Sequence, residues 1–259
     1  MNKRLAVLIA AAILPAVAFA MPARARSARP VPGRTLPMSA ESMPHHKFGS
    51  FGAALVGSAP VQPGPSAVAV DGATDTIYVV NGFNPDGPPG PAGDTVSVID
   101  GRRCDARDVS RCRGPWPTVK VGNLPSSIAV DRATDTVYVT VNADSTVAVF
   151  NGATCNGRVT WGCRKPPAHV RVGPGPYGIT TDDANHTVYV TNPGLTRPGT
   201  TMSMINTLTC DGSHLAGCAR QKPSAVDVGA LPTDVHVNQA THTVYVTTFG
   251  LRHDRQAAR

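Results

Sequence analysis

The sequence predicts an all-β protein, a β-propeller of about four blades, each a four-stranded antiparallel sheet. One ten-residue segment occurs four times in near-copies, as DGATDTIYVV from Asp71, DRATDTVYVT from Asp131, DDANHTVYVT from Asp182 and NQATHTVYVT from Asn238. The stretches between the copies are short runs rich in β-branched residues, bounded by turn residues. The second unit contains no apolar stripe with the 3.6-residue period of a helix. Repeated four-stranded units of this size are typical of propeller blades.

Each complete unit contains four strands in the same order. In the second unit they are SSIAVD (Ser126–Asp131), TVYVTV (Thr136–Val141), TVAVFNG (Thr146–Gly152) and AHVRVG (Ala168–Gly173). The second strand carries three consecutive apolar residues, Val137, Tyr138 and Val139, so neither of its faces is suited to water. Stacked blades would bury both faces. A β-sandwich or a β-helix is the alternative that this pattern leaves open.

The acidic residue that begins each repeat has a structural explanation. Asp131 can accept backbone N–H bonds from the turn that follows it, and Asp182 and Asn238 stand at the same place. A catalytic role is the competing interpretation. Because an active site seldom recurs four times at similar spacing, we expect these residues to shape turns.

The count of blades is incomplete at the C-terminal end. The fourth unit has TDVHVN and TVYVTT and then stops at Phe249–Gly250, without its third and fourth strands. FGAALVG (Phe51–Gly57) matches the end-of-blade pattern, so we expect three complete blades and a partial one closed by this N-terminal strand. The alternative is a truncated larger ring, whose open blade edge would favour self-association.

The two ends of the chain lie outside the predicted propeller. Residues 1–20 combine Lys3 and Arg4 with an apolar run that ends in Ala18-Phe19-Ala20, as in a secretory signal peptide. The run is short for a membrane span and Pro15 interrupts it, so we expect a secreted or extracytoplasmic protein with no membrane span. Residues 21–50 form a Pro/Arg-rich flexible linker, 51–250 the propeller and 251–259 a basic tail.

Six cysteines form three local pairs with seven residues between partners. They are Cys104 and Cys112, Cys155 and Cys163, and Cys210 and Cys218. Paired cysteines in a secreted chain predict disulfide bonds that fasten the long hairpins. A metal site is the competing interpretation, but only the third loop contains a histidine, His214.

The formal net charge of +7 comes from the ends of the chain. The signal, the linker arginines and the tail account for the whole excess, and residues 37–251 are close to neutral. The predicted body therefore lacks the basic footprint of a nucleic-acid-binding protein. The best support for such a partner is an arginine cluster in the first Cys loop, which nearby aspartates partly neutralise: Arg102, Arg103, Arg107, Arg111 and Arg113.

Two places in the sequence carry candidate ligand-binding residues. Asp234 and His236 are two apart on a first strand, so they share a face, and with Tyr177 they could hold a small polar ligand or move a proton in the central channel. The loops after the second strands carry the others, Asn84, Asp86 and Asn192. No cofactor is predicted. Residues 51–250 contain no Glu, and the common catalytic motifs are absent.

The chain resembles the YVTN-repeat β-propeller family. The motifs that carry the resemblance are YVVN (Tyr78–Asn81), YVTV (Tyr138–Val141), YVTN (Tyr189–Asn192) and YVTT (Tyr245–Thr248), with TVSVID and VGPGPYGITTD. The Cys loops are similar to those of secreted actinobacterial members. The family is functionally mixed, and its usual blade number is seven. The resemblance therefore implies a fold but no single activity.

Three functions follow as hypotheses. The first is a secreted binding or scaffold module that recognises a protein, glycan or cell-wall ligand through one propeller face. The second is an extracytoplasmic lactonase-like or lyase-like enzyme, with Asp234 and His236 as its weak catalytic candidates. The third is nucleic-acid binding, which the near-neutral body and the secretory signal oppose.

Overall fold

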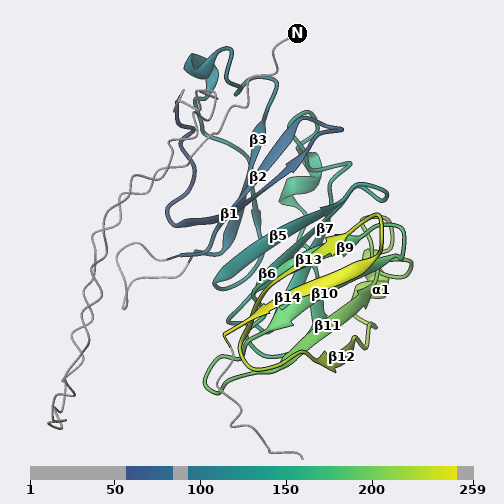
Figure 1. The fold of residues 1–259 in the computed structure, drawn as a ribbon. Helices are drawn as coiled ribbons and strands as arrows, with labels where there is room; N and C mark the ends of the chain where they lie inside the picture. Colours follow the sequence, from purple (N-terminus) through teal and green to yellow (C-terminus); the bar gives the residue numbers. More distant parts are fainter. Residues whose placement is uncertain (1–56, 84–92, 250–259) are drawn as a thin grey trace, which may run out of the picture.

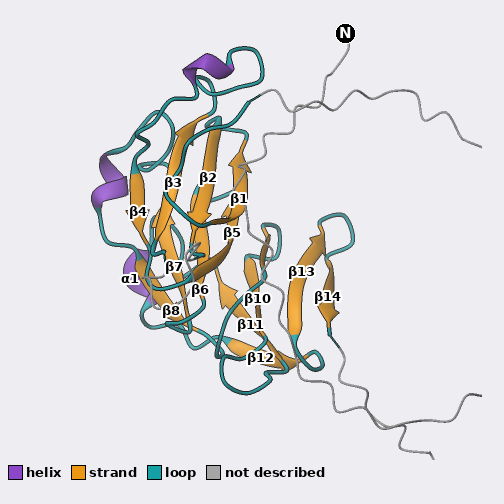
Figure 2. Cartoon of the chain, turned by 90° about the vertical axis from the view of Figure 1, so that its left-hand side faces the viewer, coloured by secondary structure: helices purple, strands orange, loops and turns teal. Residues whose placement is uncertain are grey.

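The computed structural model describes residues 57–83 and 93–249, and it is all-β apart from three short helical turns. The N-terminal strand predicted at Phe51–Gly57 lies almost wholly outside these residues, as do the signal peptide, the linker and the tail. The described chain folds into three four-stranded antiparallel sheets and one two-stranded sheet. Figure 2 shows the sheets following one another along an open arc, with the two-stranded sheet at one end.

The strands of each blade run in chain order across their sheet. Blade 1 consists of β1 (Pro65–Asp71), β2 (Thr76–Asn81), β3 (Thr95–Asp100) and β4 (Thr118–Lys120). Blade 2 consists of β5 (Pro125–Asp131), β6 (Thr136–Val141), β7 (Thr146–Asn151) and β8 (Ala168–Arg171). Blade 3 consists of β9 (Ile179–Asp182), β10 (Thr187–Asn192), β11 (Thr201–Asn206) and β12 (Ser224–Asp227). Blade 4 has only β13 (Pro232–Asn238) and β14 (Thr243–Thr248).

The cores lie between the blades, as the apolar second strands predict. Every residue of β6 is buried. Val137 and Val139 pack toward blade 1, and Tyr138 on the other face packs toward blade 3. Both faces of this strand therefore leave water, which confirms stacked blades over a sandwich with one wetted face.

The first turn of each repeat is shaped by the residue that begins it. The Ala133 N–H donates to Asp131 Oδ1 at 2.9 Å, and the Ala240 N–H donates to Asn238 Oδ1 at 3.0 Å. The turn ends on a residue with positive φ, 48° at Asp135 and 53° at His242. Asp, Asn and His are the side chains that best tolerate this conformation. The structural role predicted for the acidic residues is confirmed.

All three predicted disulfides are present, Cys104–Cys112, Cys155–Cys163 and Cys210–Cys218. Each closes the hairpin between the third and fourth strand of a blade, and each loop contains one helical turn. These turns are η1 (Val109–Arg111), η2 (Trp161–Arg164) and α1 (Leu215–Cys218). The half-cystines are buried, so the loops are part of the packed structure.

The Cys loops also join neighbouring blades. The Tyr78 hydroxyl donates to the Cys155 carbonyl at 2.8 Å, and the Tyr138 hydroxyl donates to the Cys210 carbonyl at 2.7 Å. Two residues before each tyrosine, a threonine Oγ1 accepts a loop N–H, from Gly157 to Thr76 at 2.8 Å and from Gly212 to Thr136 at 2.7 Å. The same pair of bonds therefore ties blade 1 to blade 2 and blade 2 to blade 3.

Candidate functional site

Asp234 and His236 form a contact on β13, as their spacing predicts. His236 Nε2 lies 3.3 Å from Asp234 Oδ2. The two side chains are 79% and 56% exposed, so water screens the interaction. The Asp234 backbone is fixed by an N–H bond to Thr247 Oγ1 at 3.1 Å. The pair is therefore a solvated one on a rigid strand.

The structure places this pair on a blade face, whereas the sequence analysis assigned it to the central channel. Val235 between them is buried against blade 3, so Asp234 and His236 project from the opposite face of the sheet. Their counterparts in blade 1 are Ala67 and Ala69, which pack against the core shared with blade 2. Side chains of an inner strand alternate between the two blade faces, and only the edge of the strand borders the channel.

Tyr177 is held by its backbone and has a free side chain. Its N–H donates to the Thr191 carbonyl at 2.9 Å, and its carbonyl accepts from Thr140 Oγ1 of blade 2 at 2.9 Å. The phenol is about half exposed. Within the described ranges no hydrogen bond or ion pair joins it to Asp234 or His236.

The loop candidates have different outcomes. Asn192 is fully buried, and its Nδ2 donates to Thr201 and to Ser203 Oγ at 3.0 Å, so its side chain serves the pairing of β10 with β11. The Asn192 amide is therefore not offered to a ligand at the surface. Asn84 and Asp86 lie outside the described residues.

One end of the blades carries exposed large side chains, of which the sequence analysis selected only Tyr177. They follow the second strands or precede a first strand, and they are 50–76% exposed: Phe83, Tyr177, Leu195 and Phe249. We call this end the loop face. Sequence could have indicated three of them, because each comes within a few residues of the Tyr-Val strand in NGF, NPGL and TTF.

The loop face is rigidly built. After each second strand a backbone N–H donates to the carbonyl of the linker that enters the same blade. These bonds are Phe83 to Gly64 (3.0 Å), Asn142 to Leu124 (3.0 Å), Gly194 to Pro174 (3.1 Å) and Phe249 to Leu231 (3.2 Å). These bonds hold the backbone that carries the exposed side chains, and exposed apolar groups on loops of a rigid scaffold are typical of recognition surfaces.

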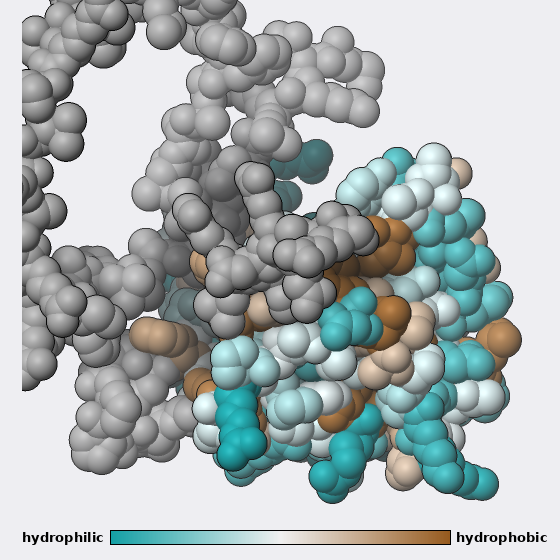
Figure 3. Space-filling model, turned by 60° about the horizontal axis from the view of Figure 1, so that its bottom comes forward, coloured by the Kyte–Doolittle hydropathy of each residue, from teal (hydrophilic) through white to brown (hydrophobic). Residues whose placement is uncertain are grey.

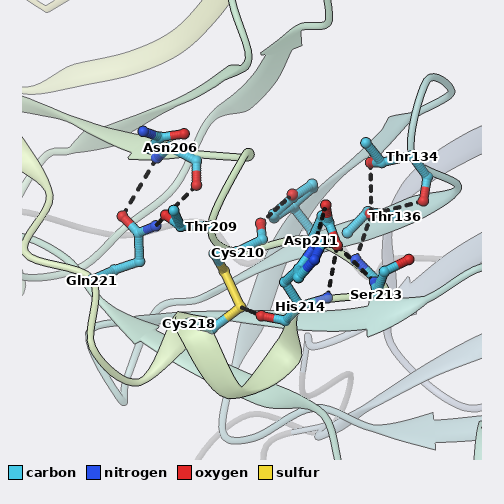
Figure 4. The surroundings of a disulfide bond; sticks show 12 residues. Thr134, Thr136, Asn206, Thr209, Cys210, Asp211, Ser213, His214, Cys218 and Gln221 are labelled. Atoms are coloured by element: carbon cyan, nitrogen blue, oxygen red, sulfur yellow. Dashed lines mark hydrogen bonds and ion pairs between the residues drawn. A yellow bond between two sulfur atoms is a disulfide. The ribbon is translucent and has the colours of Figure 1, made fainter.

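The Cys loops occupy the opposite end of the blades and carry more local ion pairs. Arg102 of the first loop is held by Asp100, with Nε and Oδ1 3.0 Å apart. Figure 4 shows the third loop, where the His214 ring lies 3.0 Å from Asp211 beside Cys210–Cys218. Within the described chain no group of three or more His, Cys, Asp or Glu side chains is arranged to hold a metal ion.

Two repeat-related aspartates have pKa values shifted in opposite directions. Burial raises the pKa of Asp131, whose Oδ2 has no hydrogen-bond partner. Burial would also raise the pKa of Asp182, but bonds from Asn185 Nδ2 (2.9 Å) and His242 Nδ1 (3.1 Å) outweigh it, and the pKa falls below its usual range. Asn185 contributes most to this lowering of the Asp182 pKa, and His242, which reaches back from blade 4 onto blade 3, adds to it.

The surface in Figure 3 mixes hydrophilic and hydrophobic side chains, and it shows no continuous hydrophilic belt on that face. None of the helices in the described chain is long and apolar enough to span a membrane.

Comparisons with known proteins identify the fold. No protein-family model matches the chain, and no curated protein matches it. Hydrazine synthase of Kuenenia stuttgartiensis aligns with a TM-score of 0.52 and 18% identity, over 73% of this chain and 43% of that one. A functionally unknown protein of Desulfotomaculum acetoxidans aligns with a TM-score of 0.49 and 17% identity, over 71% and 49%. A chain of a nidogen/laminin complex gives 0.43 and 14%, over 72% and 57%.

These identities are too low to carry a function to this chain. The chain also spans only 43% of the hydrazine synthase chain and 49% of the Desulfotomaculum protein. The sheet topology and the hydrazine synthase alignment together define the class, a β-propeller scaffold made of four-stranded blades.

Proposed function

We propose that the protein is a secreted β-propeller binding module that recognises a protein, glycan or cell-wall ligand through its loop face. The observation that carries the proposal is the set of exposed large side chains on that face, Phe83, Tyr177, Leu195 and Phe249. Isolated exposed apolar residues are common on any protein, but several at one end of a rigid scaffold favour an interaction surface.

Secretion and family membership are parts of the same proposal. The chain begins with a sequence that resembles a signal peptide, and three disulfides suit an oxidising compartment. The motifs YVVN, YVTV, YVTN and YVTT, which lie on the second strand of each sheet, support membership of the YVTN-repeat family. The aromatic rings would stack on sugar rings or enter apolar pockets of a protein ligand.

The test is binding of the full chain to a glycan array and to isolated cell-wall and secreted fractions. We expect binding that is lost when Tyr177 and Leu195 are both replaced by Ala. The matched control replaces Trp161 and Leu208, which are equally exposed at the opposite, Cys-loop end of the blades. Equal loss in both variants, or no binding by the parent chain, would overturn the proposal.

A further inference from the structure

The interfaces between blades 1 and 2 and between blades 2 and 3 follow one pattern. At both, a blade offers a second-strand tyrosine and threonine. The next blade offers the carbonyl of the first cysteine of its Cys loop and the N–H two residues later. The bonds recur between blades 1 and 2 and between blades 2 and 3 at 2.7–2.8 Å. A blade therefore has a hydroxyl-bearing face and a loop-bearing face.

A further threonine adds to the hydroxyl-bearing face. Thr140 Oγ1 donates to the Tyr177 carbonyl of the next blade at 2.9 Å, and Thr191 Oγ1 donates to the Thr233 carbonyl at 3.2 Å. Thr247 stands at the same place in blade 4.

Blade 4 leaves its hydroxyl-bearing face open. Thr243, Tyr245 and Thr247 occupy the positions that bind the next blade elsewhere in the chain, and all three are exposed. The Tyr245 side chain is 61% exposed, whereas Tyr78 and Tyr138 at the same position are fully buried. Among the described residues, blade 4 has no next blade to receive these groups.

Blade 1 leaves its loop-bearing face open. Val68 and Val70 are 61% and 54% exposed, although their counterparts in blade 2, Ile128 and Val130, pack in the first core. A hollow of about 630 Å³ lies over this face, lined by these valines with Ile77 and by Cys104 and Ala106 of the first Cys loop. The open face of blade 4 and the open face of blade 1 are therefore of the two kinds that pack together inside the chain.

The open face of blade 1 is the side of β1. Ala59, just before β1, packs with Val79 of β2 and Ile99 of β3. Val68 and Val70 of β1 remain exposed. The uncovered area is therefore narrow, which suits a neighbour of two strands, as blade 4 has in the described chain.

Ala106 of the first Cys loop also suits a neighbouring sheet of two strands. Its counterparts are Gly157 and Gly212, where a Cβ would lie 2.8 Å and 3.1 Å from the Cα of the last third-strand residue of the preceding blade, Asp100 and Asn151. Those positions have to be glycine because a third strand lies against them. Blade 4 has no third strand among the described residues, so the methyl group of Ala106 would have space beside it.

We propose that two copies of this chain pair head to tail, with blade 4 of each packed on blade 1 of the other. The contact continues the stacking already present inside each copy, and it would close a ring of eight sheets, within the range of four to eight blades known for propellers. Figure 2 shows blades 1 and 4 at opposite ends of the arc, which is why the partner is a second copy. This inference is independent of the loop face.

One feature of blade 4 weakens the contact. Asp234 and His236 stand where blade 1 has Ala67 and Ala69 at its interface with blade 2, so pairing would remove an ion pair from water. Replacing a buried ion pair by well-packed apolar residues is often neutral or favourable, and alanine is the residue that blade 1 has at both places. The variant Asp234→Ala/His236→Ala is therefore expected to associate at least as tightly as the parent.

The test has two parts. Sedimentation of the full chain is expected to give the mass of two copies, and the variant Val68→Asp/Val70→Asp, altered at two exposed positions, is expected to give one. A parent chain that stays monomeric at high micromolar concentration overturns the proposal, as does an open-ended series of larger assemblies.

The second part traps the contact. A Cβ at Gly212 would lie 3.2 Å from Thr136 Oγ1, so Ala106→Cys and Thr243→Cys are expected to form a disulfide across the same contact between copies. Mixing the two single variants under oxidising conditions should give a covalent dimer, and neither variant alone should. Linkage of Ala106→Cys to itself would show a different, symmetric contact, and no linkage in the mixture would exclude the head-to-tail one.

Discussion

Two buried tyrosine hydroxyls carry the hydrogen bonds between blades. Burial, followed by the nearby aspartates, raises the pKa of the Tyr78 and Tyr138 phenols far above the usual range, so both hydroxyls keep their proton and donate to a loop carbonyl. Tyr78→Phe or Tyr138→Phe leaves that carbonyl without its partner and should lower the free energy of unfolding by about 1–3 kcal/mol. Urea denaturation measures this.

The matched control for these substitutions is Tyr245→Phe. It removes the same atom from the same position in the repeat, but this hydroxyl is exposed in a single copy. In the single-copy background Val68→Asp/Val70→Asp we expect Tyr245→Phe to leave the free energy of unfolding unchanged. In that background, a loss equal to that of Tyr138→Phe would contradict the interface that the structure shows.

Replacing the two equivalent aspartates, Asp182 and Asp131, by asparagine should have opposite effects on the stability of the protein. The pKa of Asp182 is lowered in the fold, so its ionised form stabilises the protein at pH 7, and this contribution disappears as the pH falls through the folded-state value. Asp182→Asn should therefore lose on the order of 1 kcal/mol at pH 7 and much less near pH 3. Denaturation of parent and variant at both pH values gives the difference.

Asp131→Asn supplies the comparison. Burial raises the pKa of Asp131, so its charge is disfavoured in the fold at pH 7, and this penalty fades as the pH falls through the raised value. Asparagine keeps the turn, as Asn238 does in blade 4. We expect unchanged or higher stability at pH 7, and a loss as large as that of Asp182→Asn would contradict the assignment.

At the scale of the element, the Cys loop is both a closed hairpin and a docking surface for the preceding blade. Replacing Cys155 and Cys163 by Ser should cost about 2–3 kcal/mol from the freed loop in the chain-entropy model. It should cost more if the Cys155 carbonyl and the Gly157 N–H lose their places against Tyr78 and Thr76. Thermal unfolding of the double variant tests this.

The first loop is the control, since Cys104 and Cys112 close a loop of the same length without a blade before them in the single chain. In the single-copy background Val68→Asp/Val70→Asp, the pair Cys104→Ser/Cys112→Ser should cost less than the Cys155/Cys163 pair. Equal losses would mean that loop closure alone accounts for the effect.

For the whole molecule, the position of Asp234 and His236 bears on activity. The sequence suggested that they line a channel, and the structure shows an exposed pair on a blade face. Asp234→Ala/His236→Ala should therefore leave binding by the loop face unchanged, as measured on the ligand found in the array. If the variant loses binding, Asp234 and His236 belong to the binding site. If the parent chain hydrolyses a lactone and the variant does not, they belong to an active site.

The sequence by itself determined the strands, the turns and the disulfides of this protein. Each depends on neighbours in the chain, such as the apolar run at Val137–Val139, the turn-capping Asp131 and the even spacing of cysteines. Only the tertiary structure decided which of the candidate side chains are exposed. Asn192 is buried in sheet pairing, whereas Phe83 and Phe249 are exposed. Exposure depends on which sheet stacks on which, and the period of a strand cannot tell a covered face from an open one.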